Sequence, residues 1–371
     1  MADVVIAGAG PAGASLAVML GRAGHSVELF DARRFPREKP CGEGIMPSGV
    51  AVLGRLGLLD AVGGRRVSGV RYHGFGLEAE SAFPDVDGAP ATMLAQRRLR
   101  LDEALVAAAR ATPGVRVFED AAVEGAVVEG GRAVGLRVGG DLRRAGLVVG
   151  ADGLGSRVRR SLGLDGPARS EARVGVRAHY RLAAGRAAPE RLEIFVAPGH
   201  ELYVAPLPDG ELLVAALSAA PALGGRARAA LGRWIAETPR LAALLDGAEP
   251  LTDVAGRAPV AGRARAGFAP GAVLLGDAAR ATDPLTAGGL AHALVTAERL
   301  AAIAPRALAG DADVWLRRFD DERRRLLRAP ALLTDALLAL VRRPALARGT
   351  LRLMRAWPRV MRRLLGVAAG I

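Results

Sequence analysis

Cysteine is almost absent from this 371-residue chain, in which Cys41 is the single example. One cysteine cannot form an internal disulfide, and no cluster of cysteine and histidine residues has the spacing of a zinc or iron–sulfur site. We therefore expect no metal centre, and a chain without disulfides fits the reducing cytoplasm best.

Long apolar runs are also missing. No stretch reaches the roughly 18 to 20 residues that a membrane-spanning helix needs. Met1 leads almost directly into an apolar strand pattern that ends in glycines, which is unlike a signal peptide with its charged start and cleavage site. Because 51% of the residues are hydrophobic, we expect two domains with sizeable cores in a protein that is soluble or peripheral to a membrane.

Lysine is the third scarce residue. Lys39 is the only one, so arginine carries almost the whole net charge of +13. Eight arginines and no acidic residue lie between residues 341 and 371, and they supply +8 of that +13. Aromatic side chains make up only 4% of the chain, so few stacking surfaces are available and we expect no nucleic-acid partner.

The basic C-terminal segment also carries apolar residues at roughly helical spacing. They are Leu351, Met354, Trp357, Met361, Leu364 and Leu365. A basic helix with an apolar face is typical of proteins that lie on anionic membranes, so the segment predicts a peripheral membrane contact. Two alternatives stay open: a helical pair packed on the enzyme with solvated arginines, and the docking of an acidic carrier protein that holds the substrate.

Glycine is abundant, and the first glycines form a recognisable pattern. The segment from Asp3 to Asp31 predicts a strand, a glycine turn, a helix and a second strand. Gly8, Gly10 and Gly13 stand in GxGxxG spacing, which suits a tight turn, the approach of a pyrophosphate and close packing of helix on strand. Asp31 ends the second strand, where its carboxylate can accept a hydrogen bond from a ribose hydroxyl. These features predict a dinucleotide site, but the turn alone fits FAD and NAD equally.

The rest of the chain alternates between strand and helix patterns. Residues 98–110 predict an amphipathic helix, and residues 115–138 predict strands joined by a glycine pair. Residues 174–218 alternate in the manner of an antiparallel sheet, and residues 272–301 again predict strand, turn and helix. After about residue 306 the pattern is helical and rich in arginine.

Three separated motifs carry a resemblance to a known family. They are GAGPAG at 8–13, ADGLGSRVR at 151–159 and LLGDAARATDPLTAGGL at 274–290. Together they resemble the flavin-dependent monooxygenases typified by p-hydroxybenzoate hydroxylase, with the related geranylgeranyl reductases and flavin-dependent halogenases. The resemblance implies an α/β fold in which a Rossmann-like FAD-binding domain accompanies an antiparallel-sheet substrate domain and a C-terminal helical segment.

The predicted boundaries follow from this resemblance and from the patterns along the chain. The FAD-binding domain is discontinuous and takes residues 1–70, 95–168 and 255–305. The substrate domain takes residues 71–94 and 169–254, and residues 306–371 form the C-terminal helical region.

The resemblance also implies which residues hold FAD. In the family the middle motif lies near the pyrophosphate and the late motif supplies an aspartate to the ribityl chain, which points here to Asp152 and Asp277. Arg98 falls in an R-x-x-L-D-x-x-L pattern similar to that around the family's FAD-contacting arginine. The full set of expected cofactor residues is Gly8, Gly10, Ala12, Gly13, Asp31, Arg98, Asp152, Gly276, Asp277, Pro284, Gly288, Gly289 and Leu290.

The late motif has a physical interpretation of its own. Residues 286–290 open a helix, so free backbone N–H groups and the positive end of the helix dipole face whatever lies before them. In the family that is the N1 and O2 edge of the flavin ring, where reduced flavin carries negative charge that the helix end would stabilise. A glycine-rich helix start that merely packs tightly is the alternative.

Residues 39–47, KPCGEGIMP, resemble a loop beside the flavin in geranylgeranyl reductases and halogenases. We predict Cys41 and Glu43 as catalytic residues in this loop. The alternatives are that Cys41 is a small buried hydrophobe and that Glu43 is an ordinary surface carboxylate. His179 and Tyr203 lie in the strand-like region and are the predicted residues of the substrate pocket.

Two departures from the family narrow the function. The tryptophan-rich motif of halogenases is missing, since Trp234, Trp315 and Trp357 lie elsewhere, so halogenation is disfavoured. Arg280 stands where monooxygenases often have a histidine, which weakens the match around the cofactor phosphates.

We therefore predict an FAD-dependent oxidoreductase with FAD as cofactor and NAD(P)H as reductant. The favoured activity is a monooxygenase that hydroxylates or epoxidises an aromatic or lipophilic small molecule. The alternative is a geranylgeranyl reductase-like enzyme that saturates prenyl double bonds, and a non-catalytic flavin-binding protein is a third hypothesis.

Overall fold

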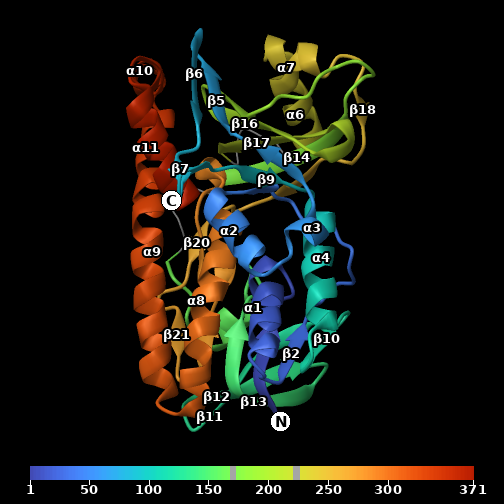
Figure 1. The fold of residues 1–371 in the computed structure, drawn as a ribbon, viewed down its shortest axis with the longest axis vertical. Coiled ribbons are helices and arrows are strands. Elements are labelled where there is room, and N and C mark those ends of the chain that lie inside the picture. The colour runs from blue at the N-terminus through green and yellow to red at the C-terminus, as the bar shows by residue number, and fades with distance from the viewer. Residues whose placement is uncertain (168–172, 220–225) are drawn as a thin grey trace.

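The computed structural model describes residues 1–167, 173–219 and 226–371, and Figure 1 shows their arrangement. Within these residues, two large sheets follow one another along the longest axis. The sheet that contains β1 (Ala2–Ala7) lies in the lower half of the view, and the sheet that contains β14 (Arg173–Arg181) lies in the upper half. The long helix α9 (Ala312–Val341) runs along one side of the molecule.

The lower sheet has a parallel centre that grows from the N-terminal βαβ unit. Its parallel strands are β10 (Val115–Phe118), β2 (Val27–Phe30), β1, β13 (Asp141–Gly150) and β22 (Ala272–Leu274), in that order. Val4 to Ala7 of β1 are fully buried, as expected for a parallel strand that is covered on both faces. The hairpin of β11 (Val123–Glu129) and β12 (Arg132–Val138) continues the sheet beyond β13, and β21 (Phe268–Ala269) pairs with β22.

Helices cover this sheet on one face. α1 (Pro11–Arg22), α4 (Arg98–Ala111) and α8 (Gly289–Ala309) share a core with β1 and β2. α1 begins with Pro11, whose fixed φ suits the first helical position and whose missing N–H costs nothing there. The short helix α5 (Arg157–Ser161) and residues of the β11–β12 hairpin pack on the other face.

The upper sheet is mainly antiparallel, as residues 174–218 predict. Its strands are β18 (Glu249–Pro250), β14, β17 (Glu211–Ala219), β16 (His200–Pro206), β15 (Leu192–Ala197), β5 (Gly69–Gly74) and β6 (Leu77–Ala82), in that order, with β19 (Ala255–Arg257) also on β14. One pairing differs from the prediction, because β15 runs parallel to β5. The two strands lie more than a hundred residues apart, so no local alternation could indicate their pairing.

The two faces of the upper sheet have different neighbours. α6 (Ala227–Ala236) and α7 (Pro239–Leu244) pack on one face through Leu231, Trp234 and Leu241. The opposite face contributes Tyr203, Leu213 and Leu217 to a core that also contains residues of α9 and the last helix. The alternation of side chains along each strand thus separates an outer helical layer from the face that meets the cofactor half of the molecule.

The chain ends in helices, as the region after residue 306 predicts. α9 packs along α8, and α10 (Pro344–Ala356) and α11 (Pro358–Ala369) pack on β6 and on α9. Both terminal helices begin with proline, so each corner follows from a residue that cannot continue the helix before it. In the part of the chain that the structure describes, no helix is both long and apolar enough to cross a membrane.

The remaining elements are short. They are α2 (Pro47–Arg55), α3 (Leu59–Val62), β3 (Gly44–Ile45), β4 (Arg65–Val67), β7 (Asp85–Val86), β8 (Ala89–Pro90), β9 (Met93–Ala95), β20 (Gly262–Arg263), β23 (Arg280–Ala281) and the 3₁₀ turns Pro208–Gly210, Gly276–Ala278 and Pro284–Thr286.

The predicted α/β class is confirmed: a parallel sheet, a mainly antiparallel sheet and C-terminal helices make up the fold. We propose the division into an FAD-binding domain, a substrate domain and a C-terminal helical region as a working description. Residues 168–172 and 220–225 fall in its ranges 95–168 and 169–254 but lie outside the described residues.

Candidate functional site

A large cavity lies where the two sheets and the start of α8 meet. It encloses about 1460 Å³ of empty space, its open mouth included. The predicted residues on its wall come from six separate segments of the chain. They are Gly10, Ala12, Cys41, Glu43, Arg98, Tyr203, Gly276, Asp277, Pro284, Gly289 and Leu290.

A second cavity of about 1210 Å³ continues from the first along the carboxyl ends of β1 and β2. Its wall contains Gly8, Asp31 and Asp152, and both cavities share Gly10, Lys39, Ala151, Gly153 and Arg257. The two spaces therefore form one long cleft with polar and charged groups at one end and a mainly apolar end between the sheets. That shape suits an extended dinucleotide with a broad ring at one end.

The glycines of the first turn occupy positions that a side chain could not enter. A Cβ on Gly8 would lie 2.5 Å from the carbonyl oxygen of Ala151, and one on Gly13 would lie 2.0 Å from the carbonyl oxygen of Gly8. Gly8 also has φ +97, which favours glycine. Gly13 is not on the cavity wall, but the lack of a side chain there lets α1 pack against the turn. Gly10 lines both cavities, and a Cβ on it would meet no atom nearer than 4.0 Å, so a ligand can approach the backbone at this glycine.

Asp31 holds the turn from the end of β2. Its carboxylate accepts the N–H of Ala9 at 2.8 Å and the N–H of Arg33 at 3.0 Å, and Nη2 of Arg37 lies 3.6 Å from Oδ2. The side chain is nearly buried yet borders the second cavity, at the place predicted for a ribose.

Two arginines converge on Gly10. The Nη2 atoms of Arg37 and Arg98 both lie 4.0 Å from the position that a Cβ of Gly10 would take. Arg98 is buried and donates two hydrogen bonds of 2.7 Å to Asp102. Burial lowers the pKa of Arg98, but Asp102 and Cys41 beside it more than offset this, so its pKa is raised and the guanidinium stays charged.

The chain's only lysine stands where the two cavities join. Among the described residues, the ammonium group of Lys39 forms no hydrogen bond or ion pair. Burial and the neighbouring Arg98 lower its pKa, against the attraction of Asp277. A cation without a protein acceptor at the middle of the cleft is suited to an anionic ligand.

The helix start predicted at residues 286–290 opens onto the large cavity. Gly288 is the residue before α8, and Gly289 and Leu290 from the first turn line the wall together with Ala293 from the second. A Cβ on Gly289 would meet no atom within 4 Å, so this side of the helix end is open. Gly288 itself is not on the wall, because the ring of His292 covers it. The free N–H groups of the first turn thus face the cavity.

Asp152 borders the second cavity and has several protein partners. Its carboxylate accepts the hydroxyl of Ser156 and the N–H groups of Arg157 and Val158, the last at 3.3 Å, and so caps the start of α5. It still borders the second cavity beside Gly153. We propose that it shapes the phosphate end of the cleft through this cap.

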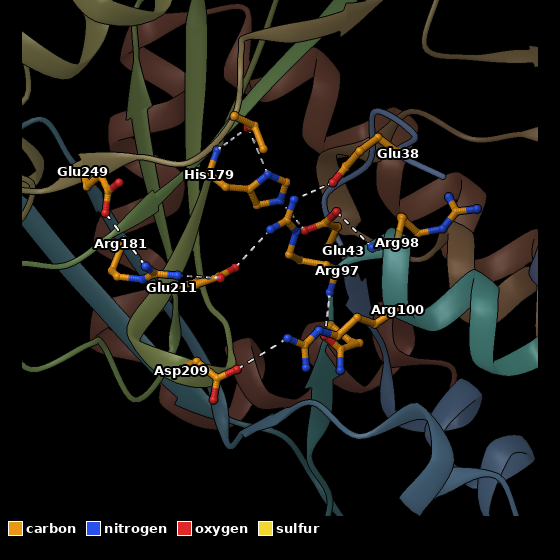
Figure 2. A network of polar contacts seen from close by, with 12 residues as sticks. Glu38, Glu43, Arg97, Arg98, Arg100, His179, Arg181, Asp209, Glu211 and Glu249 are labelled. Atoms are coloured by element: carbon orange, nitrogen blue, oxygen red, sulfur yellow. Dashed lines mark hydrogen bonds and ion pairs between the residues drawn. The ribbon is translucent and has the colours of Figure 1, made fainter. Parts of the chain in front are cut away.

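Glu43 is not the surface carboxylate that the sequence left open, because its side chain is fully buried. Oε2 lies 2.7 Å from Nε2 of His179 on β14, and Oε1 accepts the N–H of Arg98 at 3.0 Å. Figure 2 shows this contact in a polar network that spans the two sheets. Glu43 has φ +55, an uncommon conformation for a residue with a side chain, and these bonds hold it there.

His179 lies behind Glu43 rather than on the cavity wall. Its Nδ1 lies 3.2 Å from the hydroxyl of Thr252 and 3.3 Å from Nη1 of Arg177, whose other nitrogen pairs with Glu38. The ring therefore has polar partners at both nitrogens. We accordingly replace the substrate-pocket role expected for His179 with a proposed role in positioning the loop at 39–44.

Cys41 is half-buried, free of any disulfide and on the wall of the large cavity. The N–H of Glu43 donates to its Sγ at 3.4 Å, and Arg98 lies beside it. The thiol thus stands at the cavity with a cation next to it.

Tyr203 lines the large cavity from β16. Burial, with Glu201 nearby, raises the pKa of Tyr203 well above its usual value, and the phenol donates to the carbonyl oxygen of Leu285 at 3.1 Å. This hydrogen bond connects the upper sheet to the 3₁₀ turn before α8, and the ring of Tyr203 lines the cavity.

A third cavity adjoins the large one and is almost wholly apolar. It comprises about 490 Å³ of space between atoms, its open side included, and little of that space is wide enough for a water molecule. It shares Leu192 and Ala287 with the large cavity. Its remaining wall comes from β5, β15, α9 and the terminal helices, from the residue before α2 and from the 3₁₀ turn before α8. These residues are Met46, Val70, Tyr72, Ile194, Leu285, Thr286, Leu333, Leu337, Met354, Met361, Leu364, Leu365 and Ala368.

Several features of the site could not be predicted from the motifs. Arg37 and Arg257 stand outside the motifs, and the pairing of Glu43 with His179 joins residues 136 positions apart. The periodic apolar residues after Leu351 were a usable signal for the third cavity, but the sequence did not show what their inner face would meet.

The cleft fits FAD on its own geometry. Gly10 leaves room beneath two guanidinium groups for a pyrophosphate, and Lys39 has no acceptor in the part of the chain that the structure describes. The open start of α8 suits the electron-rich edge of a flavin ring. No group of three acidic, cysteine or histidine residues that could hold a metal ion occurs among the described residues.

Comparison with known proteins agrees with this geometry. A family model described as "FAD binding domain" matches residues 1–332. The menaquinone reductase of Mycolicibacterium smegmatis is 34% identical over 323 residues, which cover 81% of this chain and 75% of that protein. Digeranylgeranylglycerophospholipid reductase 2 of Methanopyrus kandleri is 28% identical over 331 residues, with 86% of this chain and 81% of that protein covered.

A flavoprotein/dehydrogenase from Cytophaga hutchinsonii has the same fold, with a TM-score of 0.86 at 23% identity over 100% of this chain and 92% of that one. The family model spans most of the chain and includes every motif that forms the cleft. The chain therefore belongs to the FAD-binding-domain family of the p-hydroxybenzoate hydroxylase type and is an FAD-dependent oxidoreductase.

Proposed function

We propose that this protein is a reductase that uses FAD to saturate a prenyl double bond in a lipophilic substrate. The observation that carries the proposal is the apolar third cavity, which meets the large cavity at Leu192 and Ala287. A substrate whose reacting bond lies beside the flavin and whose tail is apolar needs such a space next to the ring.

The similar proteins support the same choice. Both curated relatives described above align with more than four fifths of this chain, and the names of both describe reductases, one of menaquinone and one of a digeranylgeranylglycerophospholipid. This proposal therefore replaces the monooxygenase activity that the motifs led us to expect.

Saturation of a carbon–carbon double bond adds a hydride to one carbon and a proton to the other. Reduced FAD supplies the hydride in reactions of this class, and we propose NAD(P)H as the source of its electrons. The residues expected to hold FAD are those of the cleft, with Gly10, Arg98 and Lys39 at the pyrophosphate and the start of α8 at the ring.

The protein's own task is then to supply the proton and keep water out. Cys41 and Glu43 are the acidic groups that we propose for this task, because both line the large cavity on the loop at 39–44. Arg98 contacts both residues, so it fixes the loop at the cofactor. His179 holds Glu43 from the upper sheet.

A test follows the flavin spectrum of the purified holoenzyme. After reduction with dithionite under nitrogen and removal of the excess, addition of a digeranylgeranyl lipid, which carries no quinone ring, should restore the oxidised spectrum. Its fully saturated analogue has no double bond to accept the hydride and should leave the spectrum unchanged. Restoration only after oxygen is admitted, with no response to the prenyl lipid, would refute the proposal.

A further inference from the structure

The outer side of α10 carries a stripe of exposed apolar residues. Leu346 is 43% exposed, Leu353 is 45% exposed and Trp357 is 60% exposed. Leu346 and Leu353 are seven residues apart and so share one face of α10, and Trp357 follows the last residue of that helix. A group of large exposed apolar side chains is typical of a surface that binds a membrane or another protein.

The same terminal segment is strongly basic. The segment 341–371 holds eight arginines and no acidic residue. Arg362 pairs with Asp85 at 2.9 Å, but Arg359 and Arg363 on α11 are exposed and have no carboxylate partner among the described residues. The surface of the terminal helices is therefore cationic as well as apolar.

The inner side of the same two helices forms a wall of the third cavity. Met354 of α10 and Met361, Leu364 and Leu365 of α11 line it, while Trp357 marks the corner between the helices. Figure 1 shows α10 and α11 together at the edge of the molecule, beside β6 and at the end of α9. A single layer of helix thus separates the cavity from the surroundings of the protein.

We propose that the outer face of α10 and α11 binds the surface of an anionic phospholipid bilayer. The arginines match the charge of the headgroups, and Leu346, Leu353 and Trp357 reach the boundary between headgroups and acyl chains. A tryptophan at a corner of this kind suits that boundary, since its ring is apolar and its N–H is polar.

The third cavity suggests why the protein would bind a membrane, an argument that rests on the proposed function. A lipid tail that leaves the bilayer beneath α10 and α11 meets the apolar residues of the cavity wall at once. Its reacting double bond then lies toward Leu192 and Ala287, where the large cavity begins. The contact itself is independent of any reaction.

The experiment measures sedimentation of the full holoenzyme with vesicles. Vesicles of phosphatidylcholine with about one third phosphatidylglycerol are compared with vesicles of phosphatidylcholine alone. We expect binding to the anionic vesicles, at least tenfold weaker binding to the neutral ones, and loss of binding as salt is raised. Emission of Trp357 should shift to shorter wavelength on binding, and a Trp357→Phe variant identifies its share.

Two variants separate the charge from the apolar stripe. Arg359→Glu with Arg363→Glu, and Leu353→Ser with Trp357→Ser, should each weaken binding at least tenfold. Arg160→Glu with Arg233→Glu is the control, because it changes the net charge equally at exposed sites on α5 and α6 and should retain most of the binding.

The outcomes keep this proposal apart from the proposed function. Equal binding to neutral vesicles, or equal loss in the control and in the α11 variant, would overturn the membrane contact. Capture by an acidic carrier protein without any vesicle binding would overturn it too, in favour of the other partner. Reduction of a detergent-dispersed prenyl lipid without vesicle binding would leave the reductase standing, and vesicle binding without any reduction would leave only the contact.

Discussion

Oε2 of Glu43 lies 2.7 Å from Nε2 of His179, and neither side chain reaches solvent. Glu43 belongs to the loop beside the predicted flavin, and His179 belongs to the upper sheet, so this one contact joins the two halves around the large cavity. A buried charge without a partner would destabilise the fold. The contact therefore stabilises the arrangement in which the loop at 39–44 packs against the upper sheet.

Replacing Glu43 should affect stability and turnover differently. Glu43→Ala leaves His179 without its partner and should lower the free energy of unfolding by about 3 to 5 kcal/mol. Glu43→Gln keeps the shape and should retain FAD while the turnover rate falls roughly 10- to 100-fold with an altered pH profile, since positioning and proton supply both suffer. Thr252→Val removes the hydroxyl that contacts His179 and Arg177 but leaves the contact of Glu43 with His179 in place, so it is the control and should lose much less rate. A Glu43→Gln enzyme with the normal rate and pH profile would show that Glu43 has no part in the reaction.

The first turn gives a prediction about FAD retention. Gly13→Ala places a Cβ 2.0 Å from a backbone oxygen, so the turn must open and the purified protein should carry little flavin. Gly232→Ala in α6 meets no atom within 4 Å and should keep full flavin content, with stability unchanged or raised by up to about 1 kcal/mol. The ratio of flavin to protein absorbance measures both. Full flavin in Gly13→Ala would contradict the geometry described for the turn.

Lys39 gives a test of the cleft that needs no substrate. Because it is the only lysine, an amine-reactive reagent can label only this side chain and the N-terminus. Its lowered pKa should make it react faster than an ordinary lysine near neutral pH in the FAD-free protein, and bound FAD should protect it. Peptide mass spectrometry reads the result. Equal labelling with and without FAD would remove Lys39 from the cofactor site, and Lys39→Met would then bind FAD normally.

His292 predicts a specific acid sensitivity. Burial, with Arg280 nearby, lowers its pKa to about 4 from an ordinary 6.5, so the folded state resists a proton that the unfolded state accepts. The contribution of His292 to the free energy of unfolding is therefore fully present above pH 6.5. It is lost as the pH falls toward 4, and the loss amounts to up to about 3 kcal/mol. Denaturant unfolding of the holoenzyme at several pH values checks this. His292→Gln should flatten the decline in that window, and an unchanged slope would contradict the assignment.

The third cavity predicts a dependence on tail length. Ala368→Phe on α11 narrows this apolar space and should reduce turnover of a long prenyl lipid at least tenfold, mainly through KM. A short prenyl alcohol, which does not reach the cavity, should react at the normal rate. Ala356→Phe on the exposed side of α10 is the matched control. Equal losses for long and short substrates would mean that the cavity does not hold the tail.

The parts of the fold that could be predicted are those encoded over short distances. The turn with Gly8 and Gly13, the helix at Arg98 and the hairpin turn at Gly130 each depend on a few consecutive residues, and the structure has all of them. A local pattern determines its own backbone, so it can be predicted before the rest of the fold is known.

The parts that could not be predicted depend on long-range packing. The contact of Glu43 with His179 and the parallel pairing of β15 with β5 join segments that no local period relates. The terminal helices show the same limit, because their apolar residues predict a face but not whether it meets a membrane or the enzyme. In the structure, Met354 and Met361 of these helices are buried against the third cavity, whereas Leu353 and Trp357 are exposed on the surface.

The most direct test of the central claim is the mass of the product. The reduced holoenzyme is incubated with a prenyl lipid in two ways, under nitrogen and under isotopically labelled oxygen with NADPH, and the lipid is then extracted. A reductase should add two hydrogens per reduced bond under nitrogen and leave no labelled oxygen in the product of either incubation. Labelled oxygen in the lipid, with no product under nitrogen, would contradict it and restore the monooxygenase.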